Sequence, residues 1–266
     1  MTTPANPFAA INLNGTGTMR GVTLALPTDR VRDLLPAGLE LGDQQVTPAG
    51  THPVILFFHD MFRAQMSIPT LLPNMTYREH SVGVPFSYIS RGSITPGFPG
   101  PYYFMPKLYL DNFWATLGGL VFWGFAKEMA TVNVTAESYT VTSMAGQRLT
   151  SLAWKKLDGE HRPIREYPNF EPVRQMLSQP IISMLPLAMG PFFILSDFDK
   201  QWETATVCPM QTSLEVDVEY VPGYPGGRTP ASGWSPGIDQ SVIGSYELRA
   251  LWRLSLPYPP LLAFRQ

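Results

Sequence analysis

The chain has 266 residues, of which 15% are charged, and its formal net charge at pH 7 is −2. This length allows one large domain with a substantial core, and we interpret residues 1–266 as a single domain. The small net charge and the absence of a run of five basic residues exclude the basic surface that nucleic-acid binding requires.

The sequence also lacks the signals of export and of membrane insertion. Residues 1–15 contain neither a charged leader nor an apolar segment of seven residues, so they do not resemble a signal peptide. The longest mostly apolar run, residues 181–195, is too short to span a bilayer and contains Pro186 and Pro191. The single cysteine, Cys208, excludes an internal disulfide. We therefore expect a cytoplasmic protein without a membrane partner.

Helices are expected in three short segments. Residues 28–36 begin at a capping Thr or Asp and are stopped by Pro36. Residues 111–124 begin at a capping Asp or Asn, are apolar all round as in a buried helix, and end at Gly124. Residues 169–179 form the third candidate.

Strands dominate the prediction. The 27 prolines and 22 glycines are spread along the chain, which shortens every element and argues against a helix bundle. Alternation of apolar and polar residues predicts half-buried antiparallel strands, with a hairpin turn at Gly146. The alternating segments are 131–135, 138–142, 148–154, 213–221 and 245–255.

Two segments are rich in proline and glycine and are expected to be long loops. They are residues 95–106 and residues 222–237. Loops of this size in a compact domain often close over a binding site, so residues 222–237 are a candidate lid.

The common signatures of catalysis with a metal, a nucleotide or a serine nucleophile are missing. No G-x-S-x-G motif and no glycine-rich phosphate loop occurs in the sequence. The four histidines do not show the i, i+4 spacing of a helical zinc site. We expect no metal and no cofactor.

Lysine chemistry is the remaining candidate. Lys127 is one of five lysines and lies in WGFAKEMA, residues 123–130, among the apolar residues Trp123 and Phe125. A lysine amine attacks carbonyl groups only when it is neutral, and burial in an apolar pocket favours the neutral form. The alternative for such a lysine is an aliphatic stem that is covered and an amine that reaches solvent.

Five separated motifs resemble the acetoacetate decarboxylase superfamily. The resemblance covers roughly residues 20–130, and beyond them only the strand pattern is compatible. The motifs are Arg20 in TMRGVTLAL, LLPAGLEL at 34–41, Tyr77 and Glu79 in TYREH, YLDN at 109–112, and Gly119 through Met129.

This resemblance implies a fold and a set of roles. The fold is a mostly β, antiparallel, cone-shaped barrel with a few flanking helices, which encloses an apolar pocket and usually forms homo-oligomers. Lys127 matches the lysine that forms a Schiff base with a keto acid. Glu79 and Arg20 match the glutamate and arginine of the pocket, and Tyr77, Phe125 and Trp123 are expected to contact the substrate.

The sequence departs from the family pattern around this lysine. Leu120 and Val121 replace a charged pair, which predicts a more apolar cavity wall or a changed subunit contact. Glu128 replaces a second lysine and, if it were close, would favour the charged form of its neighbour. In an extended strand, however, Lys127 and Glu128 point to opposite faces.

We therefore predict a carbon–carbon lyase that acts through an iminium on a keto acid larger or more apolar than acetoacetate. Glu79 is the candidate to move protons, and Arg20 the candidate to orient it or to bind a substrate carboxylate. Aldolase or dehydratase chemistry would use the same intermediate. The alternatives are a non-enzymatic binder of an apolar small molecule and a lysine-independent lyase or cyclase.

Overall fold

A computed structural model describes most of the chain, and its elements are mostly strands. The described residues are 6, 9–68, 72–90, 100–157, 159–187, 190–217, 220–221, 224, 227–232 and 242–259. The helices are α1 (Thr28–Arg32), α2 (Phe113–Trp123) and α3 (Glu171–Leu177), with short 3-10 turns η1 (Ile164–Glu166) and η2 (Pro168–Phe170). The strands are β1 (Asn12–Pro27), β2 (Leu39–Leu41), β3 (Thr51–Met66), β4 (Met75–Ile89), β5 (Tyr102–Leu110), β6 (Lys127–Val134), β7 (Ser138–Ser143), β8 (Arg148–Lys156), β9 (Arg162–Pro163), β10 (Ile181–Leu187), β11 (Gly190–Ser196), β12 (Phe198–Asp199), β13 (Thr206–Val216), β14 (Gly227–Ser232) and β15 (Val242–Ser255).

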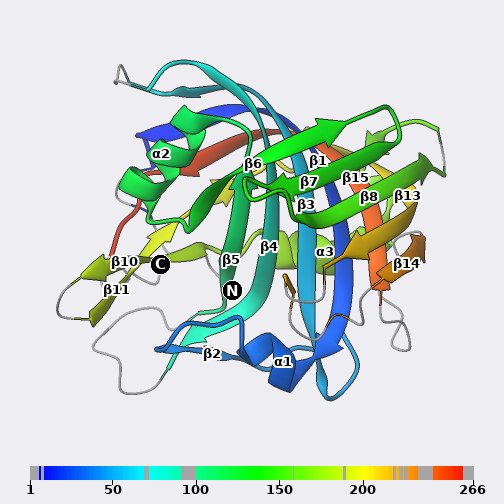
Figure 1. The fold of residues 1–266 in the computed structure, drawn as a ribbon, viewed down its shortest axis with the longest axis horizontal. Coiled ribbons are helices and arrows are strands. Elements are labelled where there is room, and N and C mark those ends of the chain that lie inside the picture. Colours follow the sequence, from blue (N-terminus) through cyan, green and yellow to red (C-terminus); the bar gives the residue numbers. More distant parts are fainter. Residues whose placement is uncertain are drawn as a thin grey trace.

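Nine of the strands in the described part of the chain close into a barrel. Their order is β5-β6-β7-β8-β13-β15-β1-β3-β4, and β4 pairs again with β5 (Figure 1). The mostly β, largely antiparallel barrel is confirmed, with one parallel pair of strands that makes it mixed. β5 and β6 are parallel, with Leu108 opposite Lys127, because α2 carries the chain back to the same end of the sheet before β6 begins.

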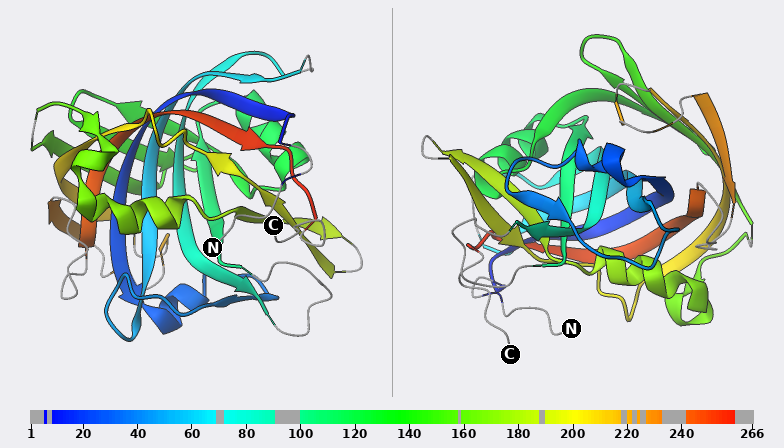
Figure 2. Two further views of the ribbon diagram at one scale, coloured as in Figure 1. Left: turned by 180° about the vertical axis from the view of Figure 1, so that it is seen from behind. Right: turned by 90° about the horizontal axis from the view of Figure 1, so that it is seen from below.

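Side chains of the barrel strands alternate between two cores. One core, which includes Phe58, Tyr139 and Leu152, collects side chains from strands all around the barrel and fills its interior. Helix α1 covers one end of this barrel (Figure 2). The second core, which includes Phe57 and Trp252, lies against the other face of the sheet and is covered by α2 and α3.

The predicted strands are present. All five alternating segments contribute to strands, and Gly146 has the left-handed backbone of a hairpin turn, with φ +85°. In β15, however, Glu247 was expected on a polar, solvent-facing side and is instead 1% exposed. Buried cationic partners, described below, explain how a carboxylate is tolerated there.

The boundaries of α2 follow its sequence signals, but its burial does not. Asn112 Oδ1 accepts a hydrogen bond from Ala115 N at 3.0 Å, and Gly124 ends the helix with φ +61°. The prediction that this helix is buried on all sides is wrong, because α2 lies on the outside of the barrel and only one of its faces is covered. Its exposed apolar residues are Phe113, Trp114, Leu117, Leu120, Val121 and Phe122.

The two predicted loops are shorter than expected. Residues 102–106 belong to β5, and residues 227–232 form β14, which pairs with β13. Apart from Tyr224 and β14, residues 222–237 lie outside the described residues, so the lid stays a prediction.

The apolar run at 181–195 forms strands. β10 and β11 pair as an antiparallel hairpin. No helix in the described ranges has both the length and the apolar character needed to cross a membrane. No group of three acidic, histidine or cysteine side chains among the described residues is placed to hold a metal ion.

Candidate active site

The turn between α2 and β6 brings Lys127 to the edge of the second core. Phe125 N donates to Gly119 O at 3.1 Å, and Lys127 N donates to Phe125 O at 2.8 Å. Phe125 is thereby folded into the core, and Lys127 becomes the first residue of β6. Its side chain is 8% exposed, so the amine does not reach solvent.

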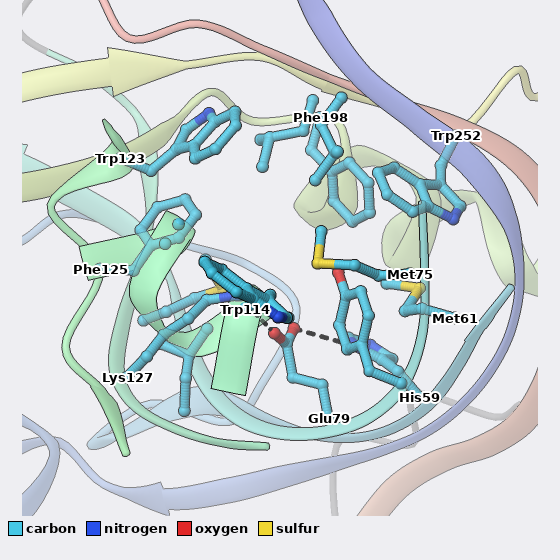
Figure 3. Close-up of a pocket in the computed structure, with 18 of the residues that line it drawn as sticks. His59, Met61, Met75, Glu79, Trp114, Trp123, Phe125, Lys127, Phe198 and Trp252 are labelled. Atoms are coloured by element: carbon cyan, nitrogen blue, oxygen red, sulfur yellow. Dashed lines mark hydrogen bonds and ion pairs between the residues drawn. The ribbon is translucent and has the colours of Figure 1, made fainter. Parts of the chain in front are cut away.

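The lysine amine contacts a buried carboxylate. Lys127 Nζ lies 2.9 Å from Glu79 Oε2, and Glu79 Oε1 lies 3.4 Å from His59 Nδ1. Glu79 on β4 and His59 on β3 are directly opposite each other in the sheet. Figure 3 shows Glu79 between Lys127 and His59, with both contacts drawn as dashed lines.

Glu79 is ionised in this arrangement. Burial raises the pKa of its carboxyl, but the adjacent Lys127 and His59 outweigh burial and lower that pKa to about 2. A carboxylate that is fixed between two nitrogen groups can accept a proton from either of them.

Gly119 leaves the space that the lysine side chain occupies. A Cβ atom on Gly119 would lie 2.3 Å from Lys127 Cδ and 3.1 Å from its Nζ. A residue with any side chain at this position of α2 would therefore displace the amine from Glu79.

The Lys127–Glu79 pair faces a mostly apolar cavity of about 50 Å³. Trp114 is 47% exposed and lines the cavity, which places it at the boundary with solvent. Other lining side chains include Met61, Met75, Leu108, Phe198 and Trp252 (Figure 3).

The three residues expected to contact substrate all line this cavity. Lys127 Nζ lies 5.8 Å from the ring centres of both Tyr77 and Phe125. Trp123 is 2% exposed, and its indole N–H donates to Ser255 O at 2.7 Å, which fixes the ring in the wall.

Arg20 does not line the cavity, contrary to the expectation for it. Its guanidinium forms ion pairs with Asp60 at 2.8 Å and with Glu247 at 2.9 Å. In the sheet Arg20 lies opposite Phe58, a residue of the barrel core. Glu79 lies opposite His59, one residue further along β3, and alternation therefore places Arg20 and Glu79 on opposite faces.

Glu128 is kept away from the lysine by the same alternation. Lys127 faces the cavity, whereas Glu128 is exposed and lies beside Tyr109. Burial, and then the nearby Glu128 carboxylate, raise the pKa of Tyr109. Glu128 therefore does not contact the amine.

Two ionisable residues near the cavity were not predicted from the sequence. His59 contacts Glu79, and Lys200 is 4% exposed in an adjoining cavity. No local motif marks either residue. His59 could have been found only from the pairing of β3 with β4, and Lys200 only from the placement of α3 and β12.

A family model described as acetoacetate decarboxylase (ADC) matches residues 1–175. The chain belongs to the acetoacetate decarboxylase family. Solved structures extend the likeness in fold over nearly the whole chain. No curated protein matches the sequence.

Two solved acetoacetate decarboxylase-family folds illustrate this likeness. The acetoacetate decarboxylase of Legionella pneumophila subsp. pneumophila str. Philadelphia 1 superimposes with a TM-score of 0.59 at 15% identity, over 98% of this chain and 88% of that chain. An acetoacetate decarboxylase-like enzyme from Sphingomonas wittichii RW1 gives 0.53 at 14% identity, over 93% and 92%.

A third structure, the enduracididine biosynthesis enzyme MppR complexed with pyruvate, gives a TM-score of 0.62. The identity is 12%, over 97% of this chain and 91% of that chain. At such identities the likeness concerns the fold.

Proposed function

We propose that this protein is a carbon–carbon lyase that forms a Schiff base between Lys127 and a keto acid. The observation that carries the proposal is a buried amine, 2.9 Å from an ionised carboxylate, at the wall of an apolar cavity. The names of related structures, an acetoacetate decarboxylase and a pyruvate complex, agree with keto acids as the substrate class.

The reaction begins when the keto acid enters and separates the Lys127–Glu79 pair, which in the free protein keeps Glu79 ionised. The proton of the amine then passes to Glu79. The neutral amine adds to the ketone carbon and gives a carbinolamine. Glu79 returns its proton to the departing hydroxyl, and water leaves as the iminium forms. His59 holds the second oxygen of Glu79 and keeps the carboxylate aimed at the amine.

The iminium then accepts the electron pair of a bond to a neighbouring carbon. In a decarboxylation the carboxylate leaves as carbon dioxide and the pair forms an enamine. A proton added to the enamine carbon regenerates an iminium, and water hydrolyses it to a ketone and free Lys127. In an aldol cleavage the group that leaves is an aldehyde or ketone, and the pair again forms an enamine. In a dehydration the iminium instead accepts the pair of a C–H bond as a base removes the proton, and the enamine then expels a hydroxyl group, which leaves as water.

The lining of the cavity favours an apolar substrate, whereas its volume does not favour a large one. Its walls are mainly aromatic, methionine and aliphatic side chains, which favours a keto acid with an apolar substituent. Its volume of about 50 Å³ favours a compact one. The prediction that Leu120 and Val121 form the cavity wall is wrong, because both are exposed on the outer face of α2.

Self-association is part of the proposal. The outer face of α2, with Leu120, Val121 and Phe122 each more than 40% exposed, offers an apolar surface to another copy of the chain. Light scattering of the purified protein measures the number of copies.

One feature favours the non-enzymatic alternative. The same ion pair with Glu79 that positions Lys127 also stabilises a buried charge, so the pair alone would serve a binding protein. Covalent chemistry at the amine separates the two functions.

Borohydride trapping tests the Schiff base. The protein is incubated with a panel of keto acids, reduced with borohydride and digested, and the modified residue is located by mass spectrometry. We expect an adduct on Lys127 and none in Lys127→Met. Lys107→Met is the matched control, since Lys107 lies over the ring of Tyr220, with 5.3 Å between its amine and the ring centre.

A keto acid that the wild-type protein turns over without an adduct on Lys127, and that Lys127→Met turns over at the same rate, would remove the Schiff base. Binding without turnover or adduct across the panel would favour the non-enzymatic alternative.

A further inference from the structure

A second, smaller cavity adjoins the first, and Lys127 is not among the described residues that line it. Its volume is about 20 Å³, and we call it the donor chamber. The two cavities share the walls His59, Met105, Ile181 and Phe198. The polar side chains that line the donor chamber, in addition to His59, are Ser81, Tyr103, Gln179 and Lys200.

Lys200 brings an amine to this chamber without a paired carboxylate. Its Nζ donates to Leu177 O at 2.8 Å and, more weakly, to Phe198 O at 3.4 Å. It also lies 4.3 Å from the ring centre of Phe198. Among the described residues it forms no ion pair, although an ammonium group has three donors. Burying such a group without an anion is costly.

Two hydroxyl groups in the chamber also lack partners. Ser81 is 1% exposed and Tyr103 5%, and neither hydroxyl oxygen makes a hydrogen bond with any described residue. Gly83 makes room for the tyrosine, since a Cβ on it would lie 1.7 Å from Tyr103 Oη. Buried hydroxyls normally find a partner, so these two indicate a ligand group.

The described lining of the chamber is therefore rich in hydrogen-bond donors. Gln179 fits the same pattern, because its Oε1 already accepts from Phe86 N at 2.8 Å and its amide nitrogen is the group left to donate. Among the residues that the structure describes, no aspartate or glutamate lines the chamber. A carboxylate needs several N–H and O–H donors and is complementary to this set.

We propose that the donor chamber binds a carboxylate of the substrate through Lys200, Ser81 and Tyr103 while the ketone reacts at Lys127. This assignment rests on the proposed function and adds a substrate class to it. Ser81 follows Glu79 by two residues on the same face of β4, which separates the two positions by roughly 7 Å. The substrate is then a keto acid whose carboxylate lies several bonds away from the reacting ketone.

The ionisation of Lys200 fits this role. Burial lowers the pKa of its amine to about 7, and Asp199 opposes that effect. Asp199 is exposed, and its Oδ1 already accepts from Gln201 N at 2.8 Å. A carboxylate bound in the chamber would supply the missing negative charge and hold Lys200 in its charged form.

Two probes of similar size test the subsite. Levulinate carries a ketone and a distant carboxylate, and methyl n-butyl ketone replaces that carboxylate by an apolar end. Borohydride trapping at Lys127 is measured over a range of concentrations of each probe. In Lys200→Met we expect the half-saturating concentration of levulinate to rise about tenfold or more, and that of the ketone to stay within about twofold.

Milder variants guard against a folding defect. Tyr103→Phe and Ser81→Ala each remove one hydroxyl. Each should raise the half-saturating concentration of levulinate by about threefold to tenfold. Tyr220→Phe is the matched control, because its buried hydroxyl lies in the barrel core and has no partner among the described residues either. Equal weakening of both probes in Lys200→Met, or unchanged levulinate trapping in all three chamber variants, would overturn the assignment.

A carboxylate without a ketone separates this proposal from the Schiff base. Valerate binding, measured by calorimetry, should depend on Lys200 and be retained in Lys127→Met. Valerate binding that depends on Lys200, without any trapping at Lys127, would keep the chamber and remove the Schiff base. The carboxylate site is contradicted if valerate does not bind, or if it binds equally well to the wild-type protein and to Lys200→Met. Either result counts against the site whether or not trapping occurs at Lys127.

Discussion

Lys127 and Glu128 are neighbours in sequence but occupy different environments. The lysine side chain is buried beside Glu79, whereas the glutamate is exposed next to Tyr109. The alternation of a strand is sufficient to separate them. Glu128 therefore does not contact the amine of Lys127, although the two residues are adjacent in sequence.

Glu79→Gln should slow adduct formation at Lys127 by about 100-fold or more, because an amide cannot accept the proton of the amine. Glu128→Gln is the control and should stay within about twofold, since Glu128 makes no contact with Lys127. The rate of borohydride trapping at saturating keto acid measures both. Equal rates for the two variants would show that Glu79 does not move the proton.

Side chains that belong to local motifs in the sequence are brought together in the structure, while their roles stay predictions. Lys127, Glu79, Tyr77, Phe125 and Trp123 all line one cavity. Sequence reasoning failed for Arg20, since a residue's position in a strand gives its face only when the pairing with the next strand is known.

At the scale of elements, α2 links the barrel to the site. It makes β5 and β6 parallel, contributes Trp123 to the cavity wall and presents Gly119 to the side chain of Lys127. The two adjacent glycines in this helix are costly for helix formation, and the close approach of the lysine explains one of them.

Gly119→Ala should abolish or strongly reduce trapping at Lys127, because the added methyl group displaces the amine from Glu79. Gly118→Ala is the matched control, since the nearest described side chain to a Cβ there is Leu72, at 3.3 Å. Both changes favour the helix by about 1 kcal/mol in propensity. Circular dichroism and trapping yield, measured together, separate a misplaced lysine from a misfolded helix. Full trapping in Gly119→Ala would contradict this role.

Elements were predictable from the sequence where the signal was local. Asn112 and Gly124 mark the two ends of α2, and Gly146 marks the hairpin turn between β7 and β8. The exposure of α2 was not predictable, because an apolar sequence does not say how many of its faces find a partner. Val121 and Phe122 are apolar and yet exposed, because the outer face of α2 is not covered by any described residue.

At the scale of the molecule, the barrel wall contains a buried network of charges centred on Glu247. Arg20 pairs with one of its oxygens, and Lys156 and His161 approach the other at 2.9 and 3.0 Å. Burial raises the pKa of the Glu247 carboxyl, but His161, Arg20 and Lys156 outweigh it and lower the pKa to about 2.

This network should make the fold acid-sensitive between about pH 4.5 and pH 2. The pKa of Glu247 is lower in the folded state than its ordinary value of 4.5, so the unfolded state binds more protons in that interval. The stabilisation is complete above pH 4.5 and is lost as the pH falls through 2. Urea unfolding as a function of pH should show this slope.

Glu247→Gln should flatten that slope and destabilise the protein at pH 7 by roughly 3–5 kcal/mol, since it leaves buried cations unpaired. Glu215→Gln is the control, because its pair with Arg148 is largely exposed and should cost less than about 1 kcal/mol. A slope that survives in Glu247→Gln would assign the acid sensitivity to other groups, Glu79 first among them.

The mostly β class and the family could be predicted from the sequence, but the closure of the barrel could not. Closure depends on β1 pairing with β15, two strands from opposite ends of the chain. The interpretation of residues 1–266 as a single domain stays a prediction.

Tyr139 limits which residues around the cavity can be varied in engineering. Tyr139, on β7, is fully buried in the barrel, and its hydroxyl lies within donating distance of His59 O, at 3.1 Å, and Glu79 O, at 3.3 Å. Tyr139 thus holds the backbone of both residues from inside the barrel, on the face of the sheet opposite the cavity. A library that seeks new substrates can vary the cavity face of β3 and β4, but Tyr139 must be kept constant, because it sets the spacing on which any new site would be built.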